Sequence, residues 1–518
     1  MRFIHGLHAE ALVLTLKLLF DSIHMKNKNI FTLFFAGIFF LLSTSACKKS
    51  MDELNVNPNS PTTTNPDYLF TYSVVKGMNS YITNANVHYW LMMNWNMYFA
   101  NLGGVDAGKE YDSNDGKDAF WTEHYAQALM NAREVQRLTA GNNYLINKNS
   151  IARIWQVYLF SQLTDLFGDI PYSQALQGAT GLNFTPAYDR QQNIYPALIN
   201  ELKQATAAMD PSQALFPTNA DPIYQGNITK WANFANSLRL RLAMRLSVVN
   251  PTKAQQEIAD LQPATFISTN SENAIFRYNG EIRNPLYDLI QSGQSGGRTY
   301  PSKFLIDKLK STNDPRIGVF AQVTIESIII GIPDYEGVPN LVPSNSSIWG
   351  NYNTDASDVS KIGTWFLKQD APGVLMSAAE VNFLKAEAAL NGWWSGNAQQ
   401  LYEDGVTANI QSYTGSGISA VQTTNYIASL PAVNQENILT QTWISFTFQN
   451  GYEAYAEYRR TGFPVYTDYS GNPINTNVFP NRLTYPPTEG NLNSANYNAA
   501  LTNQGADVAA TKVWWDGN

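Results

Sequence analysis

The stretch SIARIWQVYLFSQLTDLF, residues 150–167, decides the fold class of this chain. Its large apolar side chains recur three and four residues apart, which is the spacing of one face of an α-helix. The members of this face are Ile151, Ile154, Trp155, Tyr158, Leu159 and Leu163. Aromatic side chains such as Trp155 inside such a helix are expected to belong to the core. The stretch therefore predicts a long helix that is buried against other helices.

The same spacing recurs along most of the chain outside its N-terminal region, so we predict a mainly α fold with helices packed in tetratricopeptide-type pairs. No clean repeat of about 34 residues is visible. Strand character is confined to Gln322–Ile332 and a few short stretches, and long irregular loops are expected at 101–118, 280–300, 327–364 and 462–495. The further predicted helices are Pro66–Met78, Val87–Leu102, Ala119–Thr139, Ile194–Met209, Lys230–Val249, Thr252–Asp260, Ser377–Asn391, Ala398–Tyr413 and Gln435–Tyr458. No break in composition divides residues 66–518, so they are predicted to form a single domain.

Composition excludes several functions. A net charge of −8 disfavours binding to a nucleic-acid backbone, and an aromatic content of 13% excludes a disordered chain. One cysteine and five histidines are too few for a Cys/His metal cage, and a single cysteine forms no disulfide within the chain. The sequence predicts no cofactor and no metal.

The N-terminal region has the pattern of a secretory signal that begins at Met25. Lys26 and Lys28 precede the apolar run Ile30–Leu42, and small residues follow up to Cys47. The run is shorter than the roughly 20 residues of a membrane span. Its end resembles a bacterial lipobox, although Thr44 stands where that pattern has leucine. We predict a signal region over residues 1–46, then a lipidated Cys47 and a tether over residues 47–65; a plain secreted protein with an incidental cysteine is the alternative.

Motifs of catalysis and metal binding fail on their context. Gly293–Gly297 matches G-x-S-x-G, but no histidine follows His124 to complete a triad. His88 and His124 lie in aromatic-rich helices and are expected to be structural. The oxygen-rich loop does not follow the spacing of an EF-hand, so calcium is not predicted there; its members are Asp112, Asn114, Asp115 and Asp118. A glycosidase-type pair of carboxylates stays open, because sequence cannot give a fixed separation.

Several signatures spread along the chain together resemble the SusD/RagB family of bacterial outer-membrane lipoproteins, in its starch-binding-associated SusD-like branch. Their order and spacing, more than any single motif, carry the resemblance. The signatures are NVNPNSP at 55–61, LTDLFGDIPYSQAL at 163–176, Tyr188-Asp189, Ile194-Tyr195, Glu201-Leu202, KWANFANSLRLRLAMR at 230–245, PGVLMSAAEVNFLKAEAALNGW at 372–393, YRRTGFP at 458–464, RLTYP at 482–486 and VWWD at 513–516.

Most of these signatures are typical of scaffold. Ionic groups beside a core need partners, so Arg239, Arg241 and Arg245 are expected to pair with carboxylates, and Arg459 and Arg460 are expected to be structural as well. The candidate partners are Glu380, Glu387, Glu453 and Glu457.

The resemblance implies a lipoprotein at the outer face of the outer membrane that binds a nutrient, foremost an oligosaccharide. It also implies delivery of that nutrient to a SusC-like TonB-dependent transporter, and no catalysis. Two alternatives remain at this point: a lipid-anchored glycan-degrading enzyme, and a binder of peptides or other non-sugar nutrients in the same transport role.

Two regions are candidates for the ligand surface, because sugars dock on aromatic rings that polar, Gly-rich loops can frame. One extends from Trp95 to Trp121 and the other is Ser347–Tyr352. Each of these aromatics could instead be a packing residue. The candidate ligand-binding residues are Trp95, Tyr98, Asp106, Tyr111, Trp121, Trp349 and Tyr352.

Overall fold

The computed structural model of the protein describes residues 64–78, 84–103, 116–291, 299–353, 355–474 and 479–517. Helices dominate these residues, and the prediction of a mainly α fold is confirmed. Within the described ranges, no helix combines the length and the apolar character that a bilayer span requires.

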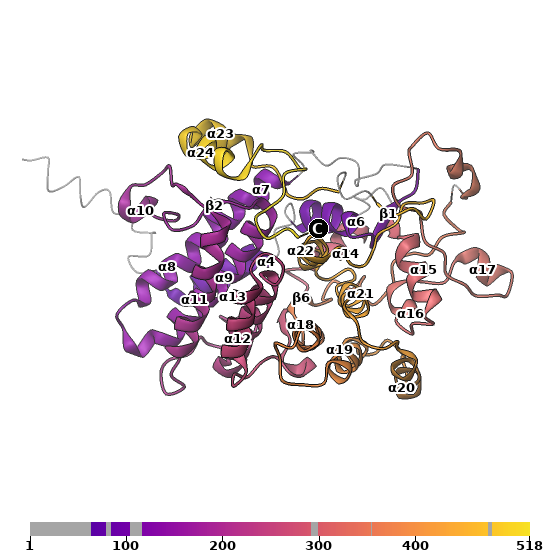
Figure 1. The fold of residues 1–518 in the computed structure, drawn as a ribbon, viewed down its shortest axis with the longest axis horizontal. Coiled ribbons are helices and arrows are strands. Elements are labelled where there is room, and N and C mark those ends of the chain that lie inside the picture. The colour runs from indigo at the N-terminus through magenta and orange to yellow at the C-terminus, as the bar shows by residue number, and fades with distance from the viewer. Residues whose placement is uncertain are drawn as a thin grey trace, which may run out of the picture. The chain divides into compact units, whose positions relative to one another are not determined.

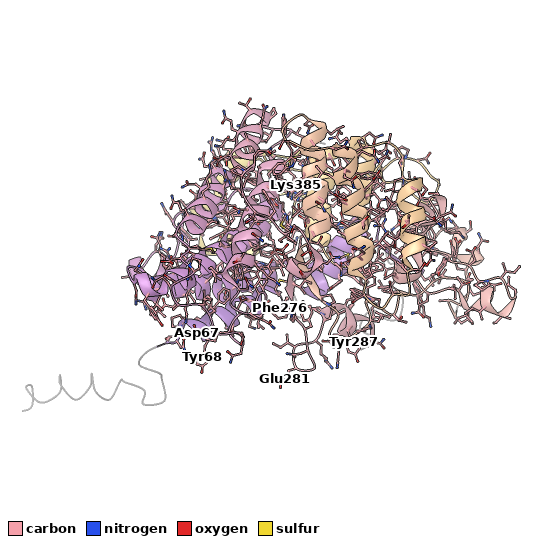
Figure 2. All side chains as sticks on the ribbon, turned by 90° about the horizontal axis from the view of Figure 1, so that it is seen from below. Asp67, Tyr68, Phe276, Glu281, Tyr287 and Lys385 are labelled. Atoms are coloured by element: carbon pink, nitrogen blue, oxygen red, sulfur yellow. The ribbon has the colours of Figure 1, made fainter. Side chains whose placement is uncertain are left out.

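The helices of the first half lie side by side (Figure 1), and several pack pairwise: α4 and α9 each on α8, α11 on α9, and α12 on α11 and on α13. Asp67 in the first turn of α4 accepts a hydrogen bond from Lys148 Nζ at 2.6 Å, which ties α4 to α9; Figure 2 labels Asp67 and its exposed neighbour Tyr68. The elements are α4 (Pro66–Met78), η1 (Asn84–Met92, a π-helix), α6 (Met93–Trp95), α7 (Lys117–Thr122), η2 (Glu123–Leu129, a π-helix), α8 (Met130–Thr139), η3 (Asn143–Leu145), α9 (Ile146–Phe167), α10 (Gly178–Gly181), α11 (Gln191–Ala207), α12 (Ile228–Arg245) and α13 (Pro251–Leu261).

The second half is organised around the helix pair α18 and α19, with α21 packed on both. Its elements are η4 (Asn270–Glu272), α14 (Pro285–Gln291), α15 (Lys303–Ser311), α16 (Ile317–Phe320), α17 (Ile325–Ile329), η5 (Ser347–Asn351), α18 (Ala378–Leu390), α19 (Ala398–Ser412), α20 (Ala420–Ser429), α21 (Gln435–Ser445), α22 (Gly451–Thr461), α23 (Pro487–Leu492) and α24 (Ser494–Gln504).

Short antiparallel strand pairs join segments that are distant in the sequence. β1 pairs with β5 in the register Ala100 to Tyr300, β2 pairs with β3, and β4 pairs with β6. The strands are β1 (Phe99–Asn101), β2 (Ile170–Pro171), β3 (Tyr188–Asp189), β4 (Ala274–Phe276), β5 (Thr299–Pro301) and β6 (Gly373–Met376).

Two predicted helices are interrupted. The helix expected over Val87–Leu102 ends at Trp95, because Met97 has a φ of 58° and the chain then enters β1. The helix expected over Gln435–Tyr458 is divided into α21 and α22 by Phe448, whose φ is 57°. Residues other than glycine rarely adopt this left-handed conformation, so local spacing does not reveal such a break.

The predicted strand Gln322–Ile332 is wrong, since its centre is the short helix α17. The amide of Ser327 donates to Thr324 Oγ1 at 3.1 Å and closes the first turn of that helix. β-Branched residues favour strands chiefly where neighbouring side chains pack on them. Here the isoleucines project from the surface instead: Ile325, Ile328, Ile329, Ile330 and Ile332 are all exposed. Helices α14, α15, α20, α23 and α24 were not predicted from the sequence.

A buried cluster of ion pairs joins the two halves. Arg241 on α12 donates to both carboxylate oxygens of Glu380 on α18, at 2.6 and 2.8 Å. Arg245 lies within ion-pair distance of Glu453 and, at 2.5 Å, of Glu457 on α22. Arg460 pairs with Glu387 at 2.7 Å. The predicted pairing of these arginines is confirmed, and it fixes α12, α18 and α22 to one another.

Arg239 differs from the prediction. It pairs with Glu257, at 2.5 Å, and with Asp260, both on α13. The Arg239 side chain contacts α13, the next helix in the sequence, and not α18 or α22. Arg459 is structural as expected, but it donates to backbone carbonyls, to Asn481 O at 2.8 Å and to Asp165 O at 2.7 Å.

Candidate functional site

Three of the aromatics predicted for the ligand surface are core residues. Trp95, Tyr98 and Trp121 are only 2%, 0% and 6% exposed. Tyr98 stacks on Trp443, with ring centroids 4.9 Å apart, and its hydroxyl donates to the Trp443 carbonyl at 2.5 Å. Trp121 meets Phe167 edge-on at 5.0 Å. The structure corrects the expectation for these three residues, because a ring that is enclosed by other rings offers no face to a sugar.

Asp106 and Tyr111, the other two candidates of this region, lie outside the described residues. So do Cys47, the loop Gly293–Gly297, and three of the four oxygen-rich loop residues, Asp118 being the exception.

Trp349 and Tyr352 have the exposure that a ligand platform requires. Both are half-buried, and their ring centroids lie 6.0 Å apart at an angle of 50°. Ser346 caps η5 through its hydroxyl, and the indole Nε1 of Trp349 donates to the Pro343 carbonyl at 2.9 Å. These bonds fix the indole while part of its surface stays open.

The two regions predicted from the sequence meet at Trp349. β1 brings Ala100 into one apolar cluster with Tyr300 and Val338, and Leu102, Trp349 and Tyr352 pack against this cluster. Beside the indole is a shallow depression with room for about 10 Å³, hardly one water molecule. It is a surface rather than a cavity. Its lining residues are Asn94, Ala100, Asn101, Pro339, Asn340, Leu341, Val342 and Trp349.

Three asparagines supply the polar groups of this surface. Asn101 Nδ2 donates to Asn94 Oδ1 at 3.3 Å, and Asn340 Nδ2 donates to the Phe99 carbonyl at 2.9 Å. The other amide atom of Asn340, Oδ1, is buried without a hydrogen-bond partner. All three asparagines are buried, and a buried acceptor without a partner is costly. Sequence reasoning missed all three asparagines, because an asparagine in an Asn-rich chain carries no local signal of its position.

The two histidines of the described residues serve the fold. Gly451 N donates to His88 Nε2 at 2.8 Å, and His124 Nδ1 lies 2.9 Å from the Phe120 carbonyl. Burial lowers the pKa of His88 to about 3 and that of His124 to about 4. Both rings are therefore neutral at physiological pH, and each is enclosed by aromatic neighbours.

Acidic groups in the core are likewise engaged in structure. Glu380, Glu387, Glu453 and Glu457 are held by arginines. Within the part of the chain that the structure describes, no three His, Cys, Asp or Glu side chains gather as ligands of a metal ion. A helical scaffold that carries an aromatic and amide surface is the architecture of a binding protein.

Comparisons with known proteins agree with that class. The family model described as "SusD-like_2: Starch-binding associating with outer membrane" matches residues 58–486. The chain therefore belongs to this SusD-like family of outer-membrane-associated nutrient-binding proteins. No curated protein matches the sequence.

Solved structures show the same fold. A chitin-binding protein is 29% identical, with a TM-score of 0.79 over 88% of this chain and 100% of its own. A SusD homolog from Bacteroides uniformis is 26% identical, with a TM-score of 0.73 over 87% of this chain and 99% of its own. A chitin-binding SusD homolog from Flavobacterium johnsoniae is 25% identical, with a TM-score of 0.72 over 87% and 98%. The predicted family is thus confirmed.

Proposed function

We propose that this protein binds an oligosaccharide at the surface around Trp349 and hands it to a SusC-like TonB-dependent transporter. The observation that carries the proposal is that residues 94–101 and 339–349, which are distant in the sequence, lie together at the half-buried indole of Trp349. Sugars present C–H faces to aromatic rings and hydroxyls to amides, and here an indole, a tyrosine ring and three asparagines adjoin one another.

The glycan class follows from the family and its relatives. The family description names starch, and two of the similar structures are chitin-binding proteins. We therefore take chito- and malto-oligosaccharides as the first ligands to test. The family, whose members are generally non-catalytic binding proteins, supports binding without turnover, against the alternative of a glycan-degrading enzyme.

The remaining parts of the proposal concern the N-terminal region and the location. We propose that residues 1–46 are a signal region with Met25 as the start, that Cys47 is lipidated at the outer face of the outer membrane, and that residues 47–65 are a tether. Residues 66–518 would then form a single binding domain, a boundary that the compact unit Asn65–Asn518 supports.

The deciding experiment is calorimetric titration of Trp349→Ala with chitohexaose and with maltohexaose. Removal of a central aromatic anchor is expected to weaken binding by about 1–3 kcal/mol with little change in thermal stability. Trp365→Ala is the matched control, since Trp365 is also half-buried and its Nε1 donates to a backbone carbonyl, that of Thr414, at 3.1 Å.

Equal affinities of wild type and Trp349→Ala for every glycan that binds would remove this surface from the proposal. Turnover of either glycan would favour the enzyme. Binding of a peptide digest in place of any glycan would favour the non-sugar nutrient.

A further inference from the structure

A large groove of the described residues lies away from Trp349. It measures about 1150 Å³ and separates α15 and α16 from α20 and α21. Figure 1 shows these four helices in the second half of the fold. Tyr335 lies on one wall, and the loop Ser416–Ile418 also lines the groove. Ligand pockets typically measure about 300–1,000 Å³, so the groove is large enough for a chain molecule.

Its floor is fixed by a buried polar network. Asp314 and Arg316 form an ion pair at 2.5 Å, and neither side chain is exposed. The Tyr426 hydroxyl of α20 donates to Asp314 Oδ2 at 2.7 Å. Arg316 donates to Gln441 Oε1 of α21 at 2.6 Å and to Asn409 Oδ1 of α19 at 2.7 Å. Because these bonds connect the walls from below, the groove is formed before any ligand arrives.

The walls combine neutral polar groups with apolar side chains such as Leu309, Ile317 and Leu430. Lys310 is engaged by Asp334 at 2.8 Å and Asp314 by Arg316, and the other charged side chains of the lining are Lys308 and Glu436. Asn425 is exposed on α20 and Thr440 is half-buried on α21. The amide and hydroxyl side chains of the lining include Ser311, Asn313, Gln422, Asn425, Ser429 and Thr440. Amides and hydroxyls that both donate and accept hydrogen bonds are complementary to the hydroxyls of an uncharged sugar chain.

One extended segment connects the groove with the Trp349 surface. Tyr335 lines the groove, and Pro339, only four residues later, lines the depression beside Trp349. Four residues of extended chain span at most about 14 Å. A polysaccharide that binds at the surface around Trp349 therefore has the groove within a short distance.

We propose that this groove is a second glycan-binding site, which takes a further stretch of a neutral polysaccharide. The inference rests on the proposed function for its ligand class but uses a separate set of residues. A peptide helix is the less suitable occupant, because helix-in-groove recognition needs a continuous hydrophobic groove, whereas amide and hydroxyl side chains are interspersed with the apolar residues of this lining.

The test is the double variant Asn425→Ala/Thr440→Ala, alone and combined with Trp349→Ala. Affinities for chitohexaose and maltohexaose are measured by calorimetry. The loss of two hydrogen-bonding side chains is expected to weaken glycan binding by about five- to tenfold in both backgrounds. Gln435→Ala is the matched control, since Gln435 is an exposed amide on α21 that does not line the groove.

The outcomes separate this inference from the proposed function. Weaker binding in Trp349→Ala with no effect of the double variant overturns the groove and keeps the Trp349 surface. The opposite pattern keeps the groove and overturns the Trp349 surface. If the wild type binds no glycan, both proposals are overturned. If the wild type binds a tryptic casein digest and the double variant binds it more weakly, the occupant of the groove is a peptide and not a glycan.

Discussion

At the residue scale, Arg245 connects the parts of the buried ion-pair cluster. Its side chain has no exposed surface, and it contacts Glu453 and Glu457 on α22. The guanidinium also lies over the Trp515 ring, 5.1 Å from the centroid. Two of the signatures that carried the family resemblance, KWANFANSLRLRLAMR and VWWD, thus meet at one side chain.

Arg245→Met is expected to destabilise the protein by about 3–5 kcal/mol, because the buried carboxylates of Glu453 and Glu457 each lose one of their two cations. Chemical denaturation measures the loss. Arg137→Met is the control: Arg137 pairs with Glu134 at 2.5 Å, but its side chain is 54% exposed, so little change is expected. Equal effects of the two substitutions would contradict the structural role of the buried cluster.

His88 makes stability depend on pH. Its pKa is about 3 in the folded protein and about 6.5 in an unfolded chain. Below pH 6.5 the unfolded chain takes up a proton that folded His88 does not, so stability falls as the pH falls from 6.5 toward 3. Between pH 6.5 and 4.5 this one group removes about 2–3 kcal/mol.

His88→Gln is expected to reduce this loss of stability at low pH. The glutamine Oε1 can accept the hydrogen bond from Gly451 N, and a glutamine side chain does not titrate. The measurement is the free energy of unfolding of both proteins at pH 6.5 and 4.5. The carboxylates contribute equally to the pH dependence of the two proteins. If the change in the free energy of unfolding between pH 6.5 and 4.5 is the same in both, His88 does not cause the effect.

At the element scale, α18 and α19 are packed closely through a glycine. A Cβ built on Gly405 of α19 would lie 2.5 Å from the Cε1 of Phe383, a buried ring on α18. Helix propensity alone would favour alanine at this position by about 1 kcal/mol. The contact across the helix pair reverses the sign.

Gly405→Ala is therefore expected to cost about 1–3 kcal/mol through overpacking, measured as a shift of the denaturation midpoint. Gly490→Ala in α23 is the control, because a Cβ there meets nothing closer than Tyr497 at 3.7 Å. We expect that variant to be neutral or more stable by up to about 1 kcal/mol. A stabilising Gly405→Ala would show that the two helices are not packed as closely as described.

α18 also carries a lysine whose environment opposes its charge. Burial lowers the pKa of Lys385 to about 8. Its Nζ nevertheless lies 4.1 Å from the centroid of Phe266 and 5.1 Å from that of Trp394, an arrangement that favours the charged form. Figure 2 labels this residue. Because the aromatic faces oppose the desolvation, we expect the lysine to stay largely protonated at pH 7.

At the scale of the whole molecule, contacts between residues that are distant in the sequence hold the described chain together. Tyr98 reaches Trp443, Tyr485 reaches Asp169, and Trp515 Nε1 reaches Asp165 at 3.1 Å. Such contacts place residues of the first 170 positions against residues of the last 80 within one compact unit. The Trp349 surface depends on the same kind of closure, because its parts come from residues 94–101 and 339–349.

The membrane anchor is the prediction that concerns the whole molecule in the cell. Cys47→Ala should move the protein from the membrane fraction to the soluble fraction, because acyl chains on Cys47 would supply its attachment. Fractionation with and without detergent measures this shift. Protease treatment of intact cells tests the outward orientation, and a variant that stays membrane-bound would contradict the lipid anchor.

The sequence by itself determined several of the long helices, the class of fold and the family. The spacing of apolar residues is a local property, so α4, α9, α12, α18 and α19 could be predicted within a few residues of their ends. The need of buried arginines for carboxylates likewise predicted that Arg241 and Arg245 pair with carboxylates of the set Glu380, Glu387, Glu453 and Glu457, and that Arg460 is structural. The partners of Arg239 were not predicted, because the sequence does not distinguish the two carboxylates on the adjacent helix α13 from those farther along the chain.

Only the tertiary structure decided which aromatics are buried and which polar groups adjoin them. Trp95 and Trp349 are alike in the sequence, each within two residues of an asparagine, yet Trp95 packs on Tyr455 in the core and Trp349 is only half-buried. Asn94, Asn101 and Asn340 come together because β1 crosses beside residues 338–342. Burial and proximity depend on contacts between residues that are hundreds of positions apart, and no local pattern of side chains encodes them.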